Sequence, residues 1–314
     1  MKKKYKQILI ISLVILLFAA YNLSIYALVT YRCGANFKSR IIEPERYLPF
    51  DDNAEFSRIE TDFQLSGEPP RIDGAAALLP VYAALVDAVY PENSVEFDGE
   101  SYTENSAIRF TDTVKAYKAV VDGSADIILC AAPSKQQREY ALQQGAELEY
   151  VPIGLEAFVF FVNADNPVDE LTVDEIRAIY SGKITNWKDV GGINRPINPI
   201  DRPEGSGSQT VMLSFMNGEE IRKNPLGIIG GAIGFSFRFY VDGIVANDGV
   251  KLLSVNGVYP DKDNIKNRTY PIIYPFYAVY RKDNDNENIA KMIDFILSED
   301  GQDIIESNGY TPIK

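Results

Sequence analysis

The pattern of apolar and polar positions divides the chain into an apolar N-terminal segment, a charged stretch and a long patterned region that begins at Arg71. In that region, short continuous apolar runs such as "ADIILCAA" and "EAFVFFVN" alternate with segments of helical spacing. Continuous apolar runs of this length are typical of strands buried on both faces of a sheet. Strands that alternate with helices predict an α/β fold of parallel sheets covered by helices on both faces.

The helices carry recognisable end signals. In "LTVDEIRAIYSG", Thr172 and Glu175 form the pattern of a capping box, and Gly182 stands just past the end. Gly123 has the same terminating position after "TVKAYKAVVD". We expect helices within residues 76–91, 113–123, 171–182 and 286–310. We expect strands within residues 125–132, 156–163, 196–200 and 271–280.

The N-terminus predicts a membrane anchor. Four lysines lie within residues 1–7, and residues 8–29 contain no charge. As a helix this run is about 33 Å long, roughly the thickness of the hydrocarbon core. The lysines place residues 1–7 in the cytoplasm and the bulk of the chain on the extracytoplasmic face of the cell membrane. A cleaved signal peptide is the alternative, although no small-x-small cleavage site follows the run.

Composition excludes several kinds of site. The 314 residues include no histidine, which rules out a Ser-His-Asp triad, a Cys-His pair and a histidine-ligated metal. The two cysteines, Cys33 and Cys130, leave a disulfide open, and Arg32 before Cys33 does not fit a lipoprotein signal. The acidic run 283–288 lacks the spacing of an EF-hand, so a solvated turn is the simpler interpretation. We expect no metal, no cofactor and no enzymatic activity.

The net charge is −13, and the part beyond the four N-terminal lysines carries −17. Such an acidic chain is not expected to bind nucleic acid. One stretch nevertheless contains the residue types of an anion-binding site. In "DRPEGSGSQT", Arg202 precedes Ser206, Gly207 and Ser208 at the start of a predicted helix. Free N–H groups at a helix start, glycines that permit close approach and an arginine fork are what a tetrahedral oxyanion or carboxylate needs. Alternatively, the serine only caps the helix and the glycines form a turn.

Several motifs resemble the phosphate-binding proteins of ABC importers. They are "IYSGKITNWKDVGG", the loop "RPEGSGSQT", "GAIGF", "NGVYPDKDNIKNRTYPI" and "SEDGQDIIESNGYTPI". The resemblance runs in order from about Arg71 to Ile313. In "SGKITNWKDVGG", Trp187 is expected to fill a hole beneath a turn.

The resemblance implies a two-lobed type II periplasmic-binding-protein fold with two crossover strands, near "PIGLEAF" and "YPIIYPF". Together with the N-terminal pattern it gives the expected organisation of the chain. Residues 1–7 are cytoplasmic, 8–29 the anchor or signal, 30–70 a stalk, 71–154 plus 274–314 lobe one, and 155–273 lobe two.

The resemblance also implies that four loops donate to the ligand. Arg202, Ser206, Gly207 and Ser208 match the fourth loop. The first loop falls at Gly74, Ala75 and Ala76, where only backbone N–H groups remain, and the second at Thr111 and Thr113. The third has Ala131 where phosphate binders of the best-known type have an aspartate that accepts the proton of hydrogen phosphate.

Two functions follow from these observations. The first is a membrane-tethered extracytoplasmic solute-binding protein for a small oxyanion, phosphate first, which serves an ABC permease or a sensor. The second is a non-transport interaction domain of the same fold, whose anion site has decayed at Ala75, Ala76 and Ala131.

Overall fold

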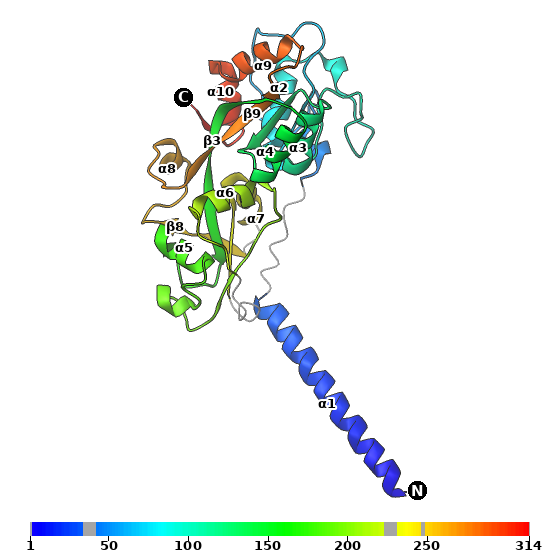
Figure 1. Ribbon diagram of the computed structural model, residues 1–314, viewed down its shortest axis with the longest axis vertical. Helices are drawn as coiled ribbons and strands as arrows, with labels where there is room; N and C mark the ends of the chain where they lie inside the picture. Colours follow the sequence, from blue (N-terminus) through cyan, green and yellow to red (C-terminus); the bar gives the residue numbers. More distant parts are fainter. Residues whose placement is uncertain (1, 34–41, 223–230, 246–248, 314) are drawn as a thin grey trace.

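The fold is a two-lobed α/β structure in a computed structural model (Figure 1). The model describes residues 2–33, 42–222, 231–245 and 249–313. Residues 34–41 of the expected stalk therefore lie outside the described residues.

Ten α-helices and four short 3-10 helices are described. The α-helices are α1 Lys2–Cys33, α2 Leu79–Val89, α3 Thr113–Asp122, α4 Lys135–Gln143, α5 Val173–Tyr180, α6 Gly207–Phe215, α7 Arg238–Val245, α8 Lys262–Lys266, α9 Asn288–Ile296 and α10 Glu299–Ser307. The 3-10 helices are η1 Pro44–Tyr47, η2 Ala76–Leu78, η3 Glu92–Ser94 and η4 Trp187–Val190.

The described strands form one large sheet and one small one. They are β1 Ile72–Gly74, β2 Ile127–Ala131, β3 Leu148–Asn163, β4 Glu170–Leu171, β5 Ile197–Pro199, β6 Gly231–Phe237, β7 Val250–Leu252, β8 Ser254–Val255, β9 Ile273–Arg281 and β10 Thr311–Pro312. The large sheet has the order β1-β2-β9-β3-β6-β5, and both β10 and β7 also pair with β3.

The sheet is mixed, which corrects the expectation of purely parallel sheets. β1 pairs with β2 and β5 with β6 in parallel, as expected for strands linked through helices. β9 pairs antiparallel with both β2 and β3, and β3 pairs antiparallel with β6. The long strand β3 runs through both lobes (Figure 1), so the crossover regions add antiparallel neighbours to each half.

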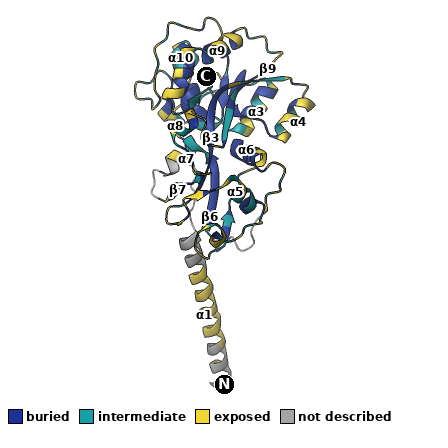
Figure 2. Ribbon diagram, turned by 90° about the vertical axis from the view of Figure 1, so that its left-hand side faces the viewer, coloured by how far each residue is buried: buried dark blue, intermediate teal, exposed yellow. Residues whose placement is uncertain are grey.

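Each lobe has its own core, built around a continuously buried stretch of the sheet (Figure 2). One core gathers buried side chains from residues 42–129 and 276–310, with Ile153 from β3. A second is formed entirely by residues 157–272, and a smaller third gathers buried residues of 116–146 with Val279 of β9. Buried Tyr47 and Phe56 belong to the first core, so the expected stalk packs on the body over part of its described length.

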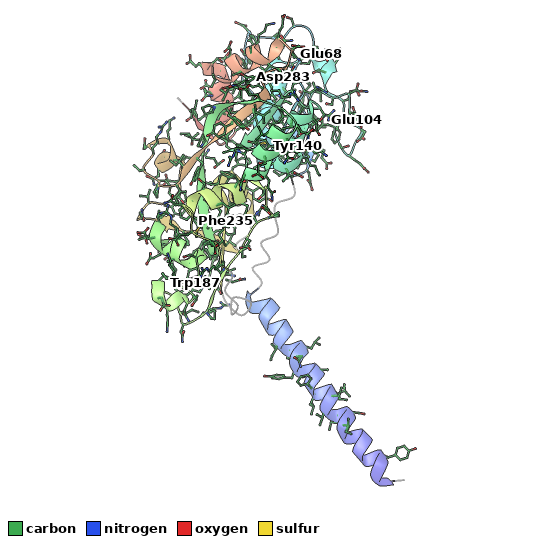
Figure 3. The ribbon with its side chains drawn as sticks, in the orientation of Figure 1. Glu68, Glu104, Tyr140, Trp187, Phe235 and Asp283 are labelled. Carbon is green, nitrogen blue, oxygen red and sulfur yellow. The ribbon has the colours of Figure 1, made fainter. Side chains whose placement is uncertain are left out.

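Local signals read from the sequence are present in the structure. Thr172 and Glu175 exchange the two hydrogen bonds of a capping box at the start of α5. Gly123 ends α3 with a positive φ of 76°. Trp187 is buried at the outer end of the second lobe (Figure 3), where its indole N–H donates to the Gly231 carbonyl at 3.1 Å.

Helix α1 is separate from the two lobes (Figure 1) and exposes its apolar side chains between Ile11 and Ile25. A search of the described residues finds no helix long and apolar enough to cross a membrane. Cys130 is buried in β2 as a free thiol, and burial raises its pKa well above the ordinary value. The side chain of Cys33 lies outside the described part of the chain.

Candidate functional site

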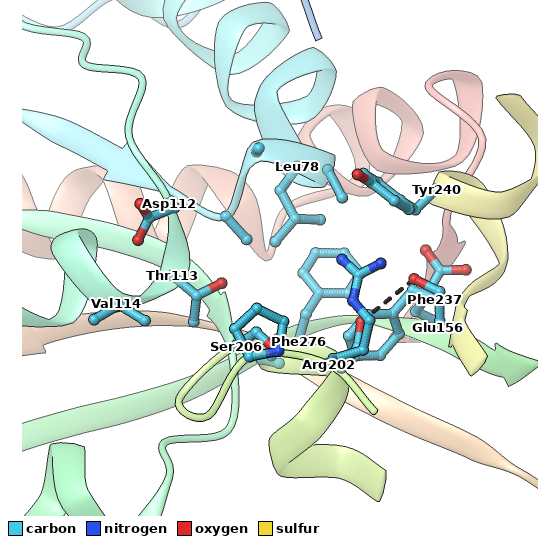
Figure 4. Close-up of a pocket in the computed structure, with 18 of the residues that line it drawn as sticks. Leu78, Asp112, Thr113, Val114, Glu156, Arg202, Ser206, Phe237, Tyr240 and Phe276 are labelled. Carbon is cyan, nitrogen blue, oxygen red and sulfur yellow. Dashed lines mark hydrogen bonds between the residues drawn. The ribbon is translucent and has the colours of Figure 1, made fainter. Parts of the chain in front are cut away.

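A cavity of about 450 Å³ lies where residues of the two lobes face each other (Figure 4). It is lined by Ala75, Ala76, Ala77, Leu78, Asp112, Thr113, Val114, Lys115, Ala131, Glu156, Arg202, Pro203, Ser206, Gly207, Ser208, Ser236, Phe237, Tyr240, Phe276 and Tyr310. The start of α6 and the loop before it form one side, so the motif singled out in the sequence does face the cavity.

The loop before α6 is held by hydrogen bonds within itself. The Ser206 hydroxyl accepts from the Gln209 amide at 3.3 Å and therefore caps α6. The Arg202 amide donates to the Gln209 side-chain carbonyl at 2.9 Å. Capping uses an oxygen lone pair of Ser206 and leaves its O–H proton for a ligand, so the capping interpretation and the anion interpretation are compatible.

Arg202 is the cation that projects into the cavity from this loop (Figure 4). Its guanidinium carbon lies 5.5 Å from the ring centre of Tyr240 in α7, a cation–π distance. Its Nε is buried and has no hydrogen-bond partner among the described residues. A buried N–H without a partner costs free energy, and an anionic ligand would remove that cost.

The opposite lobe contributes helix starts. Thr113 is the first residue of α3 and lines the cavity, and Ala76 opens η2 just before α2. The Ala75 amide already donates to the Leu129 carbonyl at 2.8 Å, as in a continued strand. The donors that this turn can offer are therefore the amides at the start of η2, which have no partner within the helix.

Two predicted ligand residues lie outside the cavity lining. The Thr111 hydroxyl donates to the buried carboxylate of Asp73 at 2.7 Å, and its amide donates to the same group at 3.1 Å. Gly74 lies inside the sheet, where a Cβ atom would meet the Leu129 amide nitrogen at 3.2 Å. These positions indicate that Thr111 and Gly74 support the first loop and do not contact a ligand.

Ala131 lines the cavity at the end of β2. A Cβ added to Gly207 would lie 3.3 Å from the Cβ of Ala131, so the start of α6 packs closely on this strand end. An aspartate at position 131 would place its carboxylate beside the α6 amides. The alanine leaves a neutral surface there instead.

Glu156 is a cavity residue that the sequence analysis missed. It comes from the middle of β3, is 6% exposed, and its Oε2 has no hydrogen-bond partner among the described residues. Burial raises the pKa of this carboxyl from 4.5 to about 8, although the Phe239 amide and the charge of Arg238 favour the ionised form. The available signal was a single acid within the otherwise apolar run "GLEAFVFFV".

The remaining wall of the cavity is formed by apolar and aromatic side chains. Leu78, Phe237, Phe276 and the rings of Tyr240 and Tyr310 contribute to it. The Tyr310 hydroxyl donates to the Ala77 carbonyl. The Tyr310 ring packs against the Phe276 ring, with 5.3 Å between the two ring centres. No single stretch of sequence predicts this wall, because its residues come from four separate segments.

The two lobes already contact each other beside the cavity. Gln137 of α4 donates through its side-chain amide to the Gly205 carbonyl at 3.1 Å. Gln136 donates to the Glu204 carboxylate at 2.8 Å. The loop before α6 in one lobe is therefore hydrogen-bonded to α4 in the other.

The comparisons with known proteins agree with the two-lobed fold. A family model described as a PBP superfamily domain matches residues 68–300. The phosphate-binding protein PstS of Bacillus subtilis is 26% identical over 256 residues, which cover 77% of this chain and 80% of the relative. PstS of Borreliella burgdorferi is 29% identical over 206 residues, 59% of this chain and 72% of the relative.

A crystal structure from Clostridium perfringens shares the fold with a TM-score of 0.59 and 27% identity, covering 79% of this chain and all of the other. That protein is described as a candidate phosphate ABC transporter substrate-binding protein with bound phosphate. A phosphate transport receptor from Vibrio cholerae has a TM-score of 0.54 at 22% identity and supports the fold alone.

Proposed function

The chain belongs to the PBP superfamily and is PstS-like, and from this premise we propose that its interlobe cavity binds a phosphate-type oxyanion for an ABC permease or a sensor. The observation that carries the proposal is the convergence of Arg202 with Ser206, Gly207 and Ser208 on one cavity. A cation and free helix-start amides are the donors that an oxyanion requires.

The proposal gives each ligand residue a role. The guanidinium fork of Arg202 contacts two ligand oxygens, and the amides of Gly207 and Ser208 donate from the start of α6. Thr113 and the η2 amides donate from the other lobe. Because donors come from both lobes, a ligand that contacts both stabilises the closed arrangement, as in hinge closure around a ligand.

The acidic exterior does not oppose this function strongly. Charges on the surface are screened beyond about 8 Å at physiological salt. Affinity is then decided by the donors within the cavity. The relatives are named as binding proteins, and we infer that this chain likewise binds its ligand without transforming it.

We propose further that the N-terminal segment tethers the binding lobes to the extracytoplasmic face of the cell membrane. The support is the uncharged run of residues 8–29 after four lysines, together with the exposed apolar side chains of α1 between Ile11 and Ile25. Membrane fractionation of the full-length chain tests this tether. Recovery of the chain without residues 1–29, or in the soluble fraction, would contradict it.

Calorimetry of the full-length protein against phosphate, sulfate and small carboxylates tests the anion site. Arg202→Ala is expected to weaken binding roughly 30- to 1,000-fold, because it removes a charge hydrogen-bonded to the ligand. Arg202→Lys should recover only part, because an ammonium group cannot reproduce the fork. Arg222→Ala is the matched control, since the Arg222 side chain lies outside the cavity and is 69% exposed.

Unchanged affinity in Arg202→Ala would place the ligand elsewhere. No heat with any anion, with a protein partner captured independently of anions, would favour the alternative of an interaction domain. The observation behind that alternative is the absence of side-chain donors at Ala75, Ala76 and Ala131, which all line the cavity.

A further inference from the structure

We propose that the ligand of this cavity is an organic phosphate with an apolar body, which carries a hydroxyl or amino group that reaches Glu156. The inference rests on the proposed function, because it assigns a ligand class to the same anion site. Three features of the cavity carry it: the apolar part of its lining, the size, and the buried unpartnered carboxyl.

Hydrogen-bond donors come from both lobes, but part of the cavity is lined by carbon alone. In Figure 4, Ser206 and Thr113 lie at one end, Glu156 and Tyr240 lie at the other, and Arg202 projects between them. An inorganic phosphate presents oxygen in every direction and needs a donor for each. Oxygens that faced carbon would be buried without hydrogen-bond partners, which is unfavourable.

An ester removes this conflict, because one oxygen carries the organic group. The phosphate head then meets Arg202 and the start of α6, while the body meets the carbon wall. That wall includes Leu78, Phe237 and Phe276. Burial of an apolar body against it is favourable at about 25 cal/mol per Å².

The volume of about 450 Å³ agrees with an organic ligand. Pockets for organic ligands span about 300–1,000 Å³, whereas an ion of five heavy atoms fills only a small part of that space.

Glu156 marks the far end of the ligand. Its carboxyl is buried with Oε2 unpartnered among the described residues, and it lines the cavity away from Ser206 and Thr113 (Figure 4). A buried polar group without a partner is rare in proteins. A hydroxyl or amino group on the ligand would supply the missing hydrogen bond.

Calorimetry of the full-length protein with inorganic phosphate, phenyl phosphate and 4-hydroxyphenyl phosphate tests the inference. We expect phenyl phosphate to bind at least tenfold more tightly than inorganic phosphate. The added hydroxyl should give a further roughly two- to tenfold gain, the range of one hydrogen bond, and Glu156→Ala should abolish that gain.

Two variants distinguish an effect of the apolar wall on ligand preference from an effect of lowered protein stability. Phe237→Ala should lower the preference for phenyl phosphate over inorganic phosphate, because Phe237 lines the cavity. Phe110→Ala is the matched control, since Phe110 is a half-buried phenylalanine that packs on the first core outside the cavity lining. It should leave the preference unchanged.

The outcomes distinguish the organic-phosphate ligand from the more general oxyanion function. Phenyl phosphate that binds no better than inorganic phosphate would overturn the inference and leave the oxyanion function intact. Failure of all three phosphates to bind would overturn both. A preference for phenyl phosphate that Phe237→Ala does not reduce would show that the ring binds outside this wall.

Discussion

Glu156 offers a direct test of the interior of the cavity, because its carboxyl is buried where a charge is unfavourable. Burial raises its pKa from 4.5 to about 8, despite the Phe239 amide and the positive charge of Arg238. The negative charge of Asp242 adds to the effect of burial. At neutral pH the folded protein therefore holds a proton at Glu156 that the unfolded chain has lost.

The sign of the pH dependence follows from this difference. The folded-state pKa lies above the unfolded value, so the contribution of Glu156 to stability is fully present below about pH 4.5. It is lost progressively as the pH rises to about 8. One pKa unit corresponds to about 1.36 kcal/mol, so between pH 5 and pH 8 the loss amounts to roughly 3–4 kcal/mol.

Glu156→Gln removes the titration and keeps the shape of the side chain. We expect the free energy of unfolding of the variant, relative to the natural protein, to increase by roughly 3–4 kcal/mol from pH 5 to pH 8. Urea unfolding at several pH values measures this quantity, and the comparison cancels the titration of all other groups. Glu204→Gln is the matched control, because Glu204 is exposed at the edge of the same cavity. Parallel pH profiles for the natural protein and Glu156→Gln would refute the reasoning.

Two further variants test the packing of the lobes. Trp187→Phe should cost about 1–3 kcal/mol, because it leaves a hole and deprives the Gly231 carbonyl of its donor; an unchanged melting temperature by circular dichroism would contradict this. Gly301→Ala should cost several kcal/mol or prevent folding, because the new Cβ would lie 2.7 Å from the Cα of Ile296. Asp303→Ala, exposed on the same helix α10, controls for the change in helix propensity, and equal melting temperatures for these two variants would show that the backbone can relax.

Local patterns in the sequence were sufficient to predict α2, α3, α5 and α6 and the region that forms α9 and α10, but not α4, α7 or α8. Thr172 and Glu175 specify a capping box because the interacting atoms are only three residues apart, and Gly123 ends α3 because it readily adopts a positive φ. The loop 202–208 could be singled out for the same reason. Its arginine, glycines and serines are adjacent in the chain, and the structure places Arg202, Ser206, Gly207 and Ser208 at one cavity.

Strand direction was not determined by local pattern. Apolar runs such as residues 156–163 indicate a buried strand, but they look the same in parallel and antiparallel sheets. β3 extends from Leu148 to Asn163 across both lobes and pairs antiparallel with β9 and β6. This pairing depends on where segments that are far apart in the chain meet.

The character of the cavity was decided by the tertiary structure alone. Thr111 has the right residue type for a ligand donor, yet its hydroxyl is used by Asp73, which comes from a strand 38 positions earlier. Glu156 has no motif around it, and its buried carboxyl matters only because Arg202, Phe237 and Tyr240 face the same space. Sequence fixes the chemistry of each side chain, whereas burial and partners arise from long-range packing, and these determine which groups remain available to a ligand.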